Sequence, residues 1–378
     1  YGDHRDLHLS LRRQRQMCIR DRVCMKALIL SGGHGTRLRP LTYSQQKQLI
    51  PVANKPILFY AIEDVIEAGV KEIGIIVGPN KEQVIETVGS KDWNAKIEFI
   101  YQGEPKGLAH AILVAEEFLG NDKFVMYLGD NILKNGIVEH MEKFKALSPN
   151  SPNSLILLTE VENPQQFGVA ELDKNGRVKR LVEKPRIPPS NYALVGIYFF
   201  EPVIIEACKN IKPSWRNELE ITDAIQWLIE NGYRVEASIV KGWWKDTGKP
   251  EDILEANRLV LDEVNHNVKG EIANSEVRGR VVINEDTIIR NSIVKGPCII
   301  GEETTIENSY IGPYTSVGRG CRILSSEIED SIVMDYAEIV NAGRIVDSLI
   351  GRNVKIMKSD SLPKSRRFVI GDTSQVWL

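Results

Sequence analysis

The residues best suited to chemistry lie in one stretch, SGGHGTRLRPLTYSQQKQLIPVANKP, at positions 31–56. Glycines open the stretch: Gly32, Gly33 and Gly35. Because glycine has no side chain, the backbone there can approach a ligand closely and point N–H groups at an anion. Cations follow the glycines: Arg37, Arg39, Lys47 and Lys55. Neither the G-K-[ST] ending of the P-loop nor the G-x-G-x-x-G pattern is present, yet a glycine loop followed by cations indicates a phosphate site. We expect Arg37 and Lys47 to bind phosphate, whereas Arg39 and Lys55 can be ordinary solvated charges.

The elements that must position this loop alternate between strand-like and helix-like runs from Met25 to about Leu261. Short apolar runs rich in β-forming residues predict strands at 26–30, 72–77, 96–101 and 123–128. Helical patterns lie between them, one ending before Gly69 and another covering 108–119. Such alternation predicts an α/β fold with a Rossmann-like, mostly parallel sheet covered by helices on both sides. Ligands bind beyond the carboxyl ends of such strands, so the glycine loop and Asp130 should share one crevice.

A different pattern begins after about residue 265, where apolar residues recur at six-residue spacing. The first series comprises Val282, Ile288, Val294, Ile300 and Ile306. This period fits neither an isolated helix nor a hairpin, and it predicts a left-handed hexapeptide β-helix whose apolar residues point inward and stack from coil to coil. A β-sandwich with coincidental spacing is the alternative. We therefore expect two domains, at 25–264 and 265–378.

Composition excludes several classes of protein. The chain has 378 residues, of which 42% are hydrophobic and 26% are charged, as is ordinary for a globular protein. A net charge of −3 gives no basic field, so we expect no nucleic-acid partner, and no apolar run is long enough to predict a membrane span. The five cysteines are scattered without a C-x-x-C pair, which indicates a reducing, cytoplasmic location. Residues 1–24 are arginine-rich and aperiodic, and we expect them to be a non-native or disordered extension.

Ordered motifs over most of the chain from Met25 resemble those of nucleotidyltransferases that join a sugar 1-phosphate to a nucleoside triphosphate. Besides the opening stretch, these motifs are YQGEPKGLAHAI, LGDNIL, FGVAEL, VEKPRIPPSNYALVGIYFF, RNELEITD and WWKDTG. Their order, with the repeats that follow, is similar to the long glucose-1-phosphate thymidylyltransferases. The resemblance implies an enzyme that makes dTDP-glucose and pyrophosphate from dTTP and glucose 1-phosphate with Mg²⁺. Residues 25–264 would then form its nucleotidyltransferase domain.

The residues agree with that chemistry. A sugar phosphate oxygen is largely ionised near neutral pH, since its second pKa is about 6, and it can attack an α-phosphorus without a general base. The catalyst must instead supply positioning and positive charge, for which Arg37 offers a rigid fork and Lys47 a mobile point charge. Mg²⁺ prefers one or two carboxylates with phosphate oxygens. The resemblance assigns the metal to Asp130 and Asp246, although either residue alone could be a cap or turn former.

The resemblance also assigns substrate-binding residues by motif position. For the nucleotide they are Leu30, Gly32, Gly33, Gly35, Thr36, Gln102, Pro105 and Gly107. The Gln102 amide offers a donor and an acceptor to the imide edge of thymine or uracil, although it could be a solvated strand end. For the sugar phosphate they are Gly168, Glu183, Lys184, Leu194 and Arg216. Glu183 can accept from sugar hydroxyls, whereas Lys184 and Arg216 can hold the phosphate.

Two positions depart from the family pattern. His34 stands where many relatives have a small residue, and Trp215-Arg216-Asn217 replaces a smaller, glycine-containing segment. The first change could alter contact with the triphosphate, and the second leaves the role of Arg216 open.

Three alternatives remain. The nucleotide could be UTP or GTP with another sugar phosphate, although Lys47-Gln48 resembles the thymidylyl enzymes. The β-helix could transfer acetyl groups, but no histidine follows His266 to act as a base, so we expect an assembly or regulatory module. The chain could be a non-catalytic regulatory subunit, which would not need Arg37, Lys47 and the two aspartates together.

We expect the protein to form a homo-oligomer.

Overall fold

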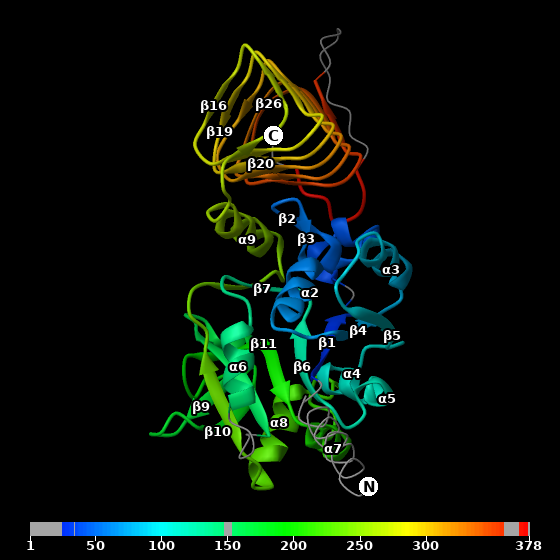
Figure 1. Cartoon of the computed structure of the whole chain (residues 1–378), viewed down its shortest axis with the longest axis vertical. Helices are drawn as coiled ribbons and strands as arrows, with labels where there is room; N and C mark the ends of the chain where they lie inside the picture. The colour runs from blue at the N-terminus through cyan, green and yellow to red at the C-terminus, as the bar shows by residue number, and fades with distance from the viewer. Residues whose placement is uncertain (1–24, 34, 147–152, 359–369, 377–378) are drawn as a thin grey trace, which may run out of the picture.

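The computed structural model describes residues 25–33, 35–146, 153–358 and 370–376. The described chain forms an α/β part and a β-helix, with helix α9 (Pro250–Leu261) lying between them (Figure 1). The predicted order of an α/β fold followed by a β-helix is confirmed. The domain bounds at 264 and 265 stay a prediction. The expected extension 1–24 and the departure at His34 lie outside the described residues.

The four predicted strands form a continuous parallel run that ends at one edge of a nine-stranded sheet. They are β1 (Met25–Ser31), β4 (Glu72–Val77), β5 (Lys96–Tyr101) and β6 (Lys123–Leu128). Their order is β5-β4-β1-β6, and the register places Leu30 beside Ile76 on one side and Leu128 on the other. The carboxyl ends of these strands therefore meet at one edge, as the sequence predicts.

Helices cover both faces of this sheet. Successive residues of a strand point to opposite sides, so neighbouring residues of β1 pack against different helices. Ile29 faces a cluster that includes residues of α2 (Ile57–Glu67), α3 (Lys81–Gly89) and α6 (Val138–Ala146). Leu28 faces a cluster built with α4 (Leu108–Val114), α7 (Val203–Asn210) and α8 (Ile221–Glu230). The single helix predicted at 108–119 is wrong. It is two helices, α4 and α5 (Glu116–Leu119), because Ala115 has a non-helical ψ of 6°.

Strand β11 (Tyr192–Phe200) continues the sheet beyond β6 in the antiparallel sense. The strands around it are β8 (Ser154–Glu160), β9 (Gly168–Leu172), β10 (Val178–Glu183) and β12 (Val235–Ile239). The register of β11 with β8 shifts between Leu194 and Tyr198, where Gly196 has a φ of 85°. A Cβ on Gly196 would lie 2.8 Å from Leu128 Cδ1, so glycine lets β11 approach the end of β6.

Short elements complete the edge of the sheet. Strand β7 (Asn131–Leu133) pairs with β13 (Trp244–Asp246) in the antiparallel sense, with Asn131 opposite Asp246. Three 3-10 helices and a hairpin follow the glycine loop: Thr36–Leu38, Leu41–Tyr43, Lys47–Leu49, β2 (Pro51–Val52) and β3 (Lys55–Pro56); a further 3-10 helix is Pro164–Gln166. The hairpin lies against the lower end of the β-helix (Figure 1).

The β-helix is a stack of short parallel strands whose equivalent residues recur about every 17 residues. Its strands, β14 to β28, are Asn267–Val268, Glu271–Ala273, Glu276–Arg278, Val281–Ile283, Ile288–Arg290, Ile293–Lys295, Cys298–Ile300, Thr305–Glu307, Tyr310–Ile311, Thr315–Val317, Arg322–Glu329, Ile332–Val333, Glu338–Val346, Leu349–Ile350 and Lys355–Met357. Val294, Ile300 and Ile306 are fully buried inside, as predicted.

The predicted inward positions Val282 and Ile288 are wrong by one residue. Ile283 and Ile289 are fully buried in their place, while Val282 and Ile288 are only partly buried. A turn of 17 residues cannot hold three spacings of six, so one spacing in a turn is shorter. The strict six-residue period misplaces the coils before that shorter step.

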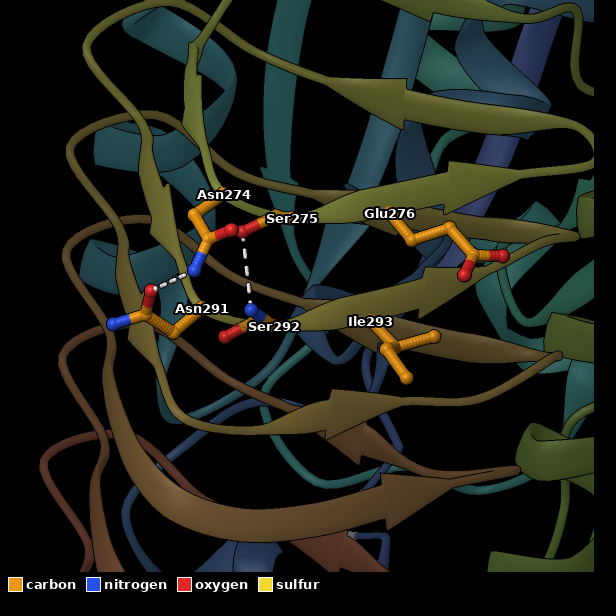
Figure 2. A pocket seen from close by; sticks show the side chains of 6 residues that line it. All are labelled: Asn274, Ser275, Glu276, Asn291, Ser292 and Ile293. Atoms are coloured by element: carbon orange, nitrogen blue, oxygen red, sulfur yellow. Dashed lines mark hydrogen bonds between the residues drawn. The ribbon is translucent and has the colours of Figure 1, made fainter.

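Polar ladders tie successive turns of the β-helix together on one flank, where residues 274–276 and 291–293 of neighbouring coils line a pocket; Figure 2 shows their side chains. Asn274 Nδ2 donates to Asn291 Oδ1 over 2.7 Å, and Ser292 N donates to Ser275 Oγ over 3.0 Å (Figure 2). The serine ladder continues at Ser309. Because these side chains hydrogen-bond one another, we interpret this flank as structural.

The β-helix packs directly on the α/β part. Leu38, which follows Arg37 in the glycine-loop segment, is 1% exposed and shares a buried cluster with Ile332 and Met334 of the β-helix. Arg258 of α9 donates two hydrogen bonds of 2.6 Å to Asp330. The last coils of the β-helix therefore support the segment that carries the candidate phosphate-binding residues.

Candidate active site

The glycine loop leaves the carboxyl end of β1 and folds back over Lys47. Gly35 has a φ of 59°, and its carbonyl accepts a hydrogen bond of 2.7 Å from Thr42 Oγ1. A Cβ on Gly35 would lie 2.9 Å from Thr42 Cγ2 and 3.1 Å from Lys47 Cβ, so only glycine allows this close fold. Gly33 is exposed, and a Cβ there would meet no described atom within 4 Å. The loop is therefore tight on its inner side and open to a ligand on its outer side, where Thr36 is also exposed.

Lys47 and Asp130 form an ion pair beyond the carboxyl end of β6. Lys47 Nζ lies 2.5 Å from Asp130 Oδ2, and Lys47 is 7% exposed. Asn131 Nδ2 donates to the other carboxylate oxygen over 2.8 Å. Burial alone would raise the pKa of Asp130, but the Lys47 ammonium and these hydrogen bonds hold that pKa below its ordinary value. Asp130 is therefore a carboxylate, as a cation ligand must be.

Asp246 lies beside this pair because β13 runs antiparallel to β7. The register puts Asp246 opposite Asn131, and Thr247 donates to the Asp130 carbonyl from its N–H over 3.1 Å and from Oγ1 over 2.7 Å. Burial and then the charge of Asp130 raise the pKa of Asp246 to about 6. The two predicted metal ligands, 116 positions apart in the sequence, are thus electrostatic neighbours.

Arg37 reaches the same side of the crevice from the 3-10 helix Thr36–Leu38. A Cβ on Gly248 would lie 3.2 Å from one guanidinium nitrogen of Arg37 and 3.3 Å from the other, so the guanidinium lies over Gly248. Gly248 follows Asp246 by two positions, and the charge of Arg37 acts to lower the pKa of Asp246. Arg37 itself is exposed, so its guanidinium can reach a phosphate group in the crevice.

The acidic residues fit a magnesium ion that is shared with phosphate groups. Two carboxylates lie near one lysine; burial raises the pKa of Asp246 most, and the negative charge of Asp130 raises it further. Over the described ranges, no group of three or more His, Cys, Asp or Glu is placed to hold a metal. Mg²⁺ needs only one or two protein carboxylates when phosphate oxygens and water complete its octahedron. Asp130 and Asp246 suit that mode of binding.

The predicted base-binding residues gather at the ends of β1 and β5. Gln102 follows β5, and its N–H donates to the Val77 carbonyl over 3.0 Å. Its Oε1 lies 3.1 Å from where a Cβ on Gly32 would be, so the amide faces the glycine loop. Gly107 has a φ of 104°, and a Cβ there would lie 2.4 Å from the Leu219 carbonyl oxygen. The turn between Pro105 and Gly107 is thereby locked against the segment that leads to α8.

The predicted sugar residues also come together. Glu183 is opposite Gly168 in the β9–β10 pair. A Cβ on Gly168 would lie 2.6 Å from Leu194 Cδ1 and 3.1 Å from Glu183 Oε2. Thr222, which sequence reasoning missed, donates to Glu183 Oε2 over 3.3 Å. Burial, followed by the charge of Glu220, raises the pKa of Glu183. Strands β9, β10 and β11 and the start of α8 therefore place the Glu183 carboxyl group next to Gly168 and Leu194.

The cations of the sugar side pair with Glu183 and with two acidic residues that the sequence analysis did not single out, Glu218 and Glu220. Arg216 lies 2.9 Å from Glu218 and 3.5 Å from both Glu183 and Glu220. Lys184 Nζ is 3.9 Å from Glu183 Oε1, which is a looser contact. The motif RNELEITD contained Glu218 and Glu220, but only the fold shows that they converge on Arg216.

The residues around Asp130 and Asp246 are neighbours of the sugar-side residues around Glu183. Phe167, next to Gly168, packs its ring edge-to-face on Trp244 of β13, with ring centroids 5.5 Å apart. Trp244 Nε1 donates to Asn131 Oδ1 over 2.7 Å. The sugar-side loop thus contacts the strand that ends in Asp246.

None of the described helices is long and apolar enough to cross a membrane.

A family profile described as nucleotidyl transferase matches residues 26–263 of this chain. The match covers more than half of the chain and includes the whole crevice, so the protein belongs to the nucleotidyl transferase family. The family resemblance that the motifs predicted is confirmed.

Three curated relatives match most of this chain. Agl11 of Haloferax volcanii, a low-salt glycan biosynthesis nucleotidyltransferase, is 52% identical over 94% of this chain and 100% of its own length. The glucose-1-phosphate thymidylyltransferase of Streptomyces antibioticus is 50% identical over 93% of this chain and 99% of its own. The bifunctional protein GlmU of Methanocaldococcus jannaschii is 42% identical over 87% of this chain and 78% of its own.

Solved structures agree on the fold of the α/β part. A Bacillus anthracis structure assigned as a glucose-1-phosphate thymidylyltransferase, in complex with sucrose, is 33% identical with a TM-score of 0.59. The match covers 64% of this chain and 97% of the Bacillus anthracis chain. A UDP-glucose pyrophosphorylase complexed with UDP-glucose is 28% identical with a TM-score of 0.56, over 63% of this chain and 99% of its own.

Proposed function

We propose that the protein transfers a thymidylyl group from dTTP to glucose 1-phosphate and releases dTDP-glucose and pyrophosphate. The observation that carries the proposal is the placement of Lys47, Asp130 and Asp246 together beside a glycine loop at the carboxyl end of a parallel sheet. The 50% identity with a glucose-1-phosphate thymidylyltransferase supports the choice of both substrates.

The reaction needs one displacement at phosphorus. An anionic oxygen of glucose 1-phosphate forms a bond to the α-phosphorus of dTTP, and the bond from that phosphorus to the bridging oxygen of the β-phosphate breaks. The electron pair of the broken bond leaves with pyrophosphate. Because the attacking oxygen is already ionised, no side chain has to remove a proton, and catalysis consists of positioning and charge stabilisation.

The residues of the crevice divide this work. Lys47 is placed to exchange the Asp130 carboxylate for a triphosphate oxygen, and Arg37 can hold the leaving phosphates with its bidentate guanidinium. When bound by Asp130 and Asp246, Mg²⁺ would supply further positive charge to the phosphate oxygens. Gly33 and Thr36 are exposed residues of the glycine loop, and we assign their N–H groups to the same anion.

On the acceptor side, we assign the sugar to the floor formed by Gly168, Leu194 and Glu183. Glu183 can accept hydrogen bonds from sugar hydroxyls. Lys184 is the less engaged cation, so we assign it to the sugar phosphate. Arg216 is surrounded by three carboxylates, and we assign it to ordering that acidic group.

The β-helix is assigned to assembly and support. Acetyl transfer there would need a base, and the last histidine of the chain, His266, is exposed before the first strand of the stack. We also propose that the protein forms a homo-oligomer and works in the cytoplasm.

A substrate panel tests the proposal. Purified protein is incubated with Mg²⁺, one of dTTP, UTP or GTP, and glucose 1-phosphate or its amino and galacto analogues, and pyrophosphate is measured. The expected result is the highest kcat/KM for dTTP with glucose 1-phosphate. A higher kcat/KM for UTP or GTP would replace the thymidylyl assignment, and no release with any pair would indicate a non-catalytic protein.

A further inference from the structure

Gln102 has a second neighbour that the proposed chemistry does not use. Its Nε2 lies 3.2 Å from Nδ1 of His110, in the first turn of α4, and 3.5 Å from the carbonyl oxygen of Gly107. Its Oε1 lies on the other side, against Gly32 of the glycine loop. The two ends of one amide therefore face different surroundings, and its orientation decides what a base would meet.

The surroundings favour one orientation. The Gly107 carbonyl can only accept a hydrogen bond, and it is fixed by the backbone, because Ala109 N and Leu219 N bond across this turn over 3.0 and 2.8 Å. An amide nitrogen at that place donates, whereas an amide oxygen would be repelled. A neutral His110 with its proton on Nε2 adds a second acceptor on the same side. Burial and the charge of Lys106 lower the pKa of His110, in agreement with a neutral ring.

We propose that His110 is a positioning residue for nucleotide selectivity: its Nδ1 holds the Gln102 amide with Oε1 toward the glycine loop, where the base would bind. The proposal rests on the assignment of Gln102 as the base-reading residue. His110 does not touch the reacting atoms. It fixes which end of the amide the base encounters.

The fixed orientation selects a particular base edge. Thymine and uracil carry an N3–H donor, which an amide oxygen can accept. Cytosine has an unprotonated N3 acceptor at the same place, which that oxygen would repel. If the amide turned over, its NH₂ group would face the base, and cytosine would be accepted more readily. His110 therefore discriminates against cytosine through Gln102.

The test compares kcat/KM for dTTP and dCTP with glucose 1-phosphate. His110→Ala removes the acceptor and should lower the dTTP:dCTP ratio about five- to tenfold, the effect of one hydrogen bond. His110→Leu removes it too, so either folded variant gives the result. His110→Asn keeps an acceptor near the position of Nδ1 and should restore the ratio to within about twofold. A merely structural role of His110 would slow both nucleotides equally.

His140→Asn is the matched control, because His140 lies on another helix, α6, and also hydrogen-bonds a side chain, Ser238 Oγ, over 2.9 Å. It should leave the ratio unchanged. Gln102→Ala tests base reading by Gln102 separately from the role of His110. If it lowers the ratio and His110→Ala does not, the role of His110 is wrong. If Gln102→Ala leaves the ratio unchanged, base reading by Gln102 is wrong, and this inference fails with it.

Discussion

Lys47 and Asp130 pair at 2.5 Å in a crevice where both groups would be needed for different partners, one for phosphate and the other for a cation. The pair gives the buried Lys47 an anionic partner while no substrate is bound, and it holds the pKa of the half-buried Asp130 below its ordinary value. When a triphosphate arrives with a cation, Lys47 can exchange the Asp130 carboxylate for a phosphate oxygen. Asp130 can exchange the Lys47 ammonium for the cation. The crevice is thereby preorganised for phosphate chemistry without an unpaired buried charge.

Replacement of Asp130 tests the role of that carboxylate. Asp130→Asn keeps the size of the side chain but removes its charge, so kcat for pyrophosphate release should fall about 10²-fold or more at saturating Mg²⁺. Circular dichroism should show a folded protein, although Lys47 loses its partner and the melting temperature should fall. An unchanged kcat in the folded variant would remove Asp130 from the site. Asp246→Asn should behave alike.

Arg37 and Lys184 should differ in which kinetic constant they change. Charge on the leaving pyrophosphate grows toward the transition state, so Arg37→Ala should lower kcat about 10²–10³-fold. Lys184→Ala should mainly raise KM for glucose 1-phosphate, because its charge meets only that substrate. Steady-state rates with each substrate varied in turn separate these effects. An intact kcat in Arg37→Ala, or a change confined to the nucleotide KM in Lys184→Ala, would contradict this arrangement.

Asp64 makes the stability of the protein depend on pH. Its carboxylate accepts a hydrogen bond of 2.8 Å from Tyr127 Oη, but burial raises its pKa from 3.8 to about 7. The folded state therefore favours the protonated acid, so the stability that Asp64 contributes is present below about pH 4 and lost as pH rises through 7. Such a shift is worth on the order of 1–4 kcal/mol.

Asp64→Asn should consequently melt at a higher temperature than the unmodified protein at pH 8, and at nearly the same temperature at pH 4. Differential scanning calorimetry at the two pH values measures this. The substitution lies away from the crevice, so kcat should not change. Lower stability of the variant at pH 8 would show that the charged form of Asp64 is the one the fold favours.

Asn257 joins the two parts of the molecule. It is 1% exposed, and its Oδ1 accepts from Ala53 N over 2.8 Å and from Ser316 Oγ over 2.7 Å, while its Nδ2 donates to the Tyr314 carbonyl over 3.0 Å. Asn257→Ala leaves these buried groups without their partner and should cost about 2 kcal/mol or more in urea unfolding. Asn210→Ala replaces an exposed asparagine whose Nδ2 donates to the Glu206 carbonyl within its own helix, and it should cost less than about 0.5 kcal/mol. Equal losses would show that Asn257 does not join the two parts.

Local sequence pattern was sufficient for the strands that build the crevice. The predicted runs at 72–77, 96–101 and 123–128 coincide with β4, β5 and β6, because apolar β-forming runs between helical patterns leave little choice in an α/β protein. Spacing alone was insufficient for the β-helix, where Val282 and Ile288 were predicted one residue too early. The order of five- and six-residue steps depends on how the coils stack.

The site shows a similar division. Asp130 could be placed near the glycine loop because it follows the predicted strand 123–128, and Asp246 could be added only through the family resemblance. The roles of Glu218, Glu220 and His110 could not be predicted, since each depends on contacts between segments that converge only in the fold. The assignments of all site residues stay proposals that the variants above test.

The central claim is that the α-phosphorus of dTTP is transferred intact to glucose 1-phosphate. Phosphorus NMR of a reaction containing protein, Mg²⁺, dTTP and glucose 1-phosphate follows every phosphorus at once. We predict that dTDP-glucose and pyrophosphate form in equal amounts, and that Asp130→Asn nearly abolishes both. Release of inorganic phosphate in place of pyrophosphate, or an unchanged dTTP spectrum in the presence of folded protein, would contradict the account.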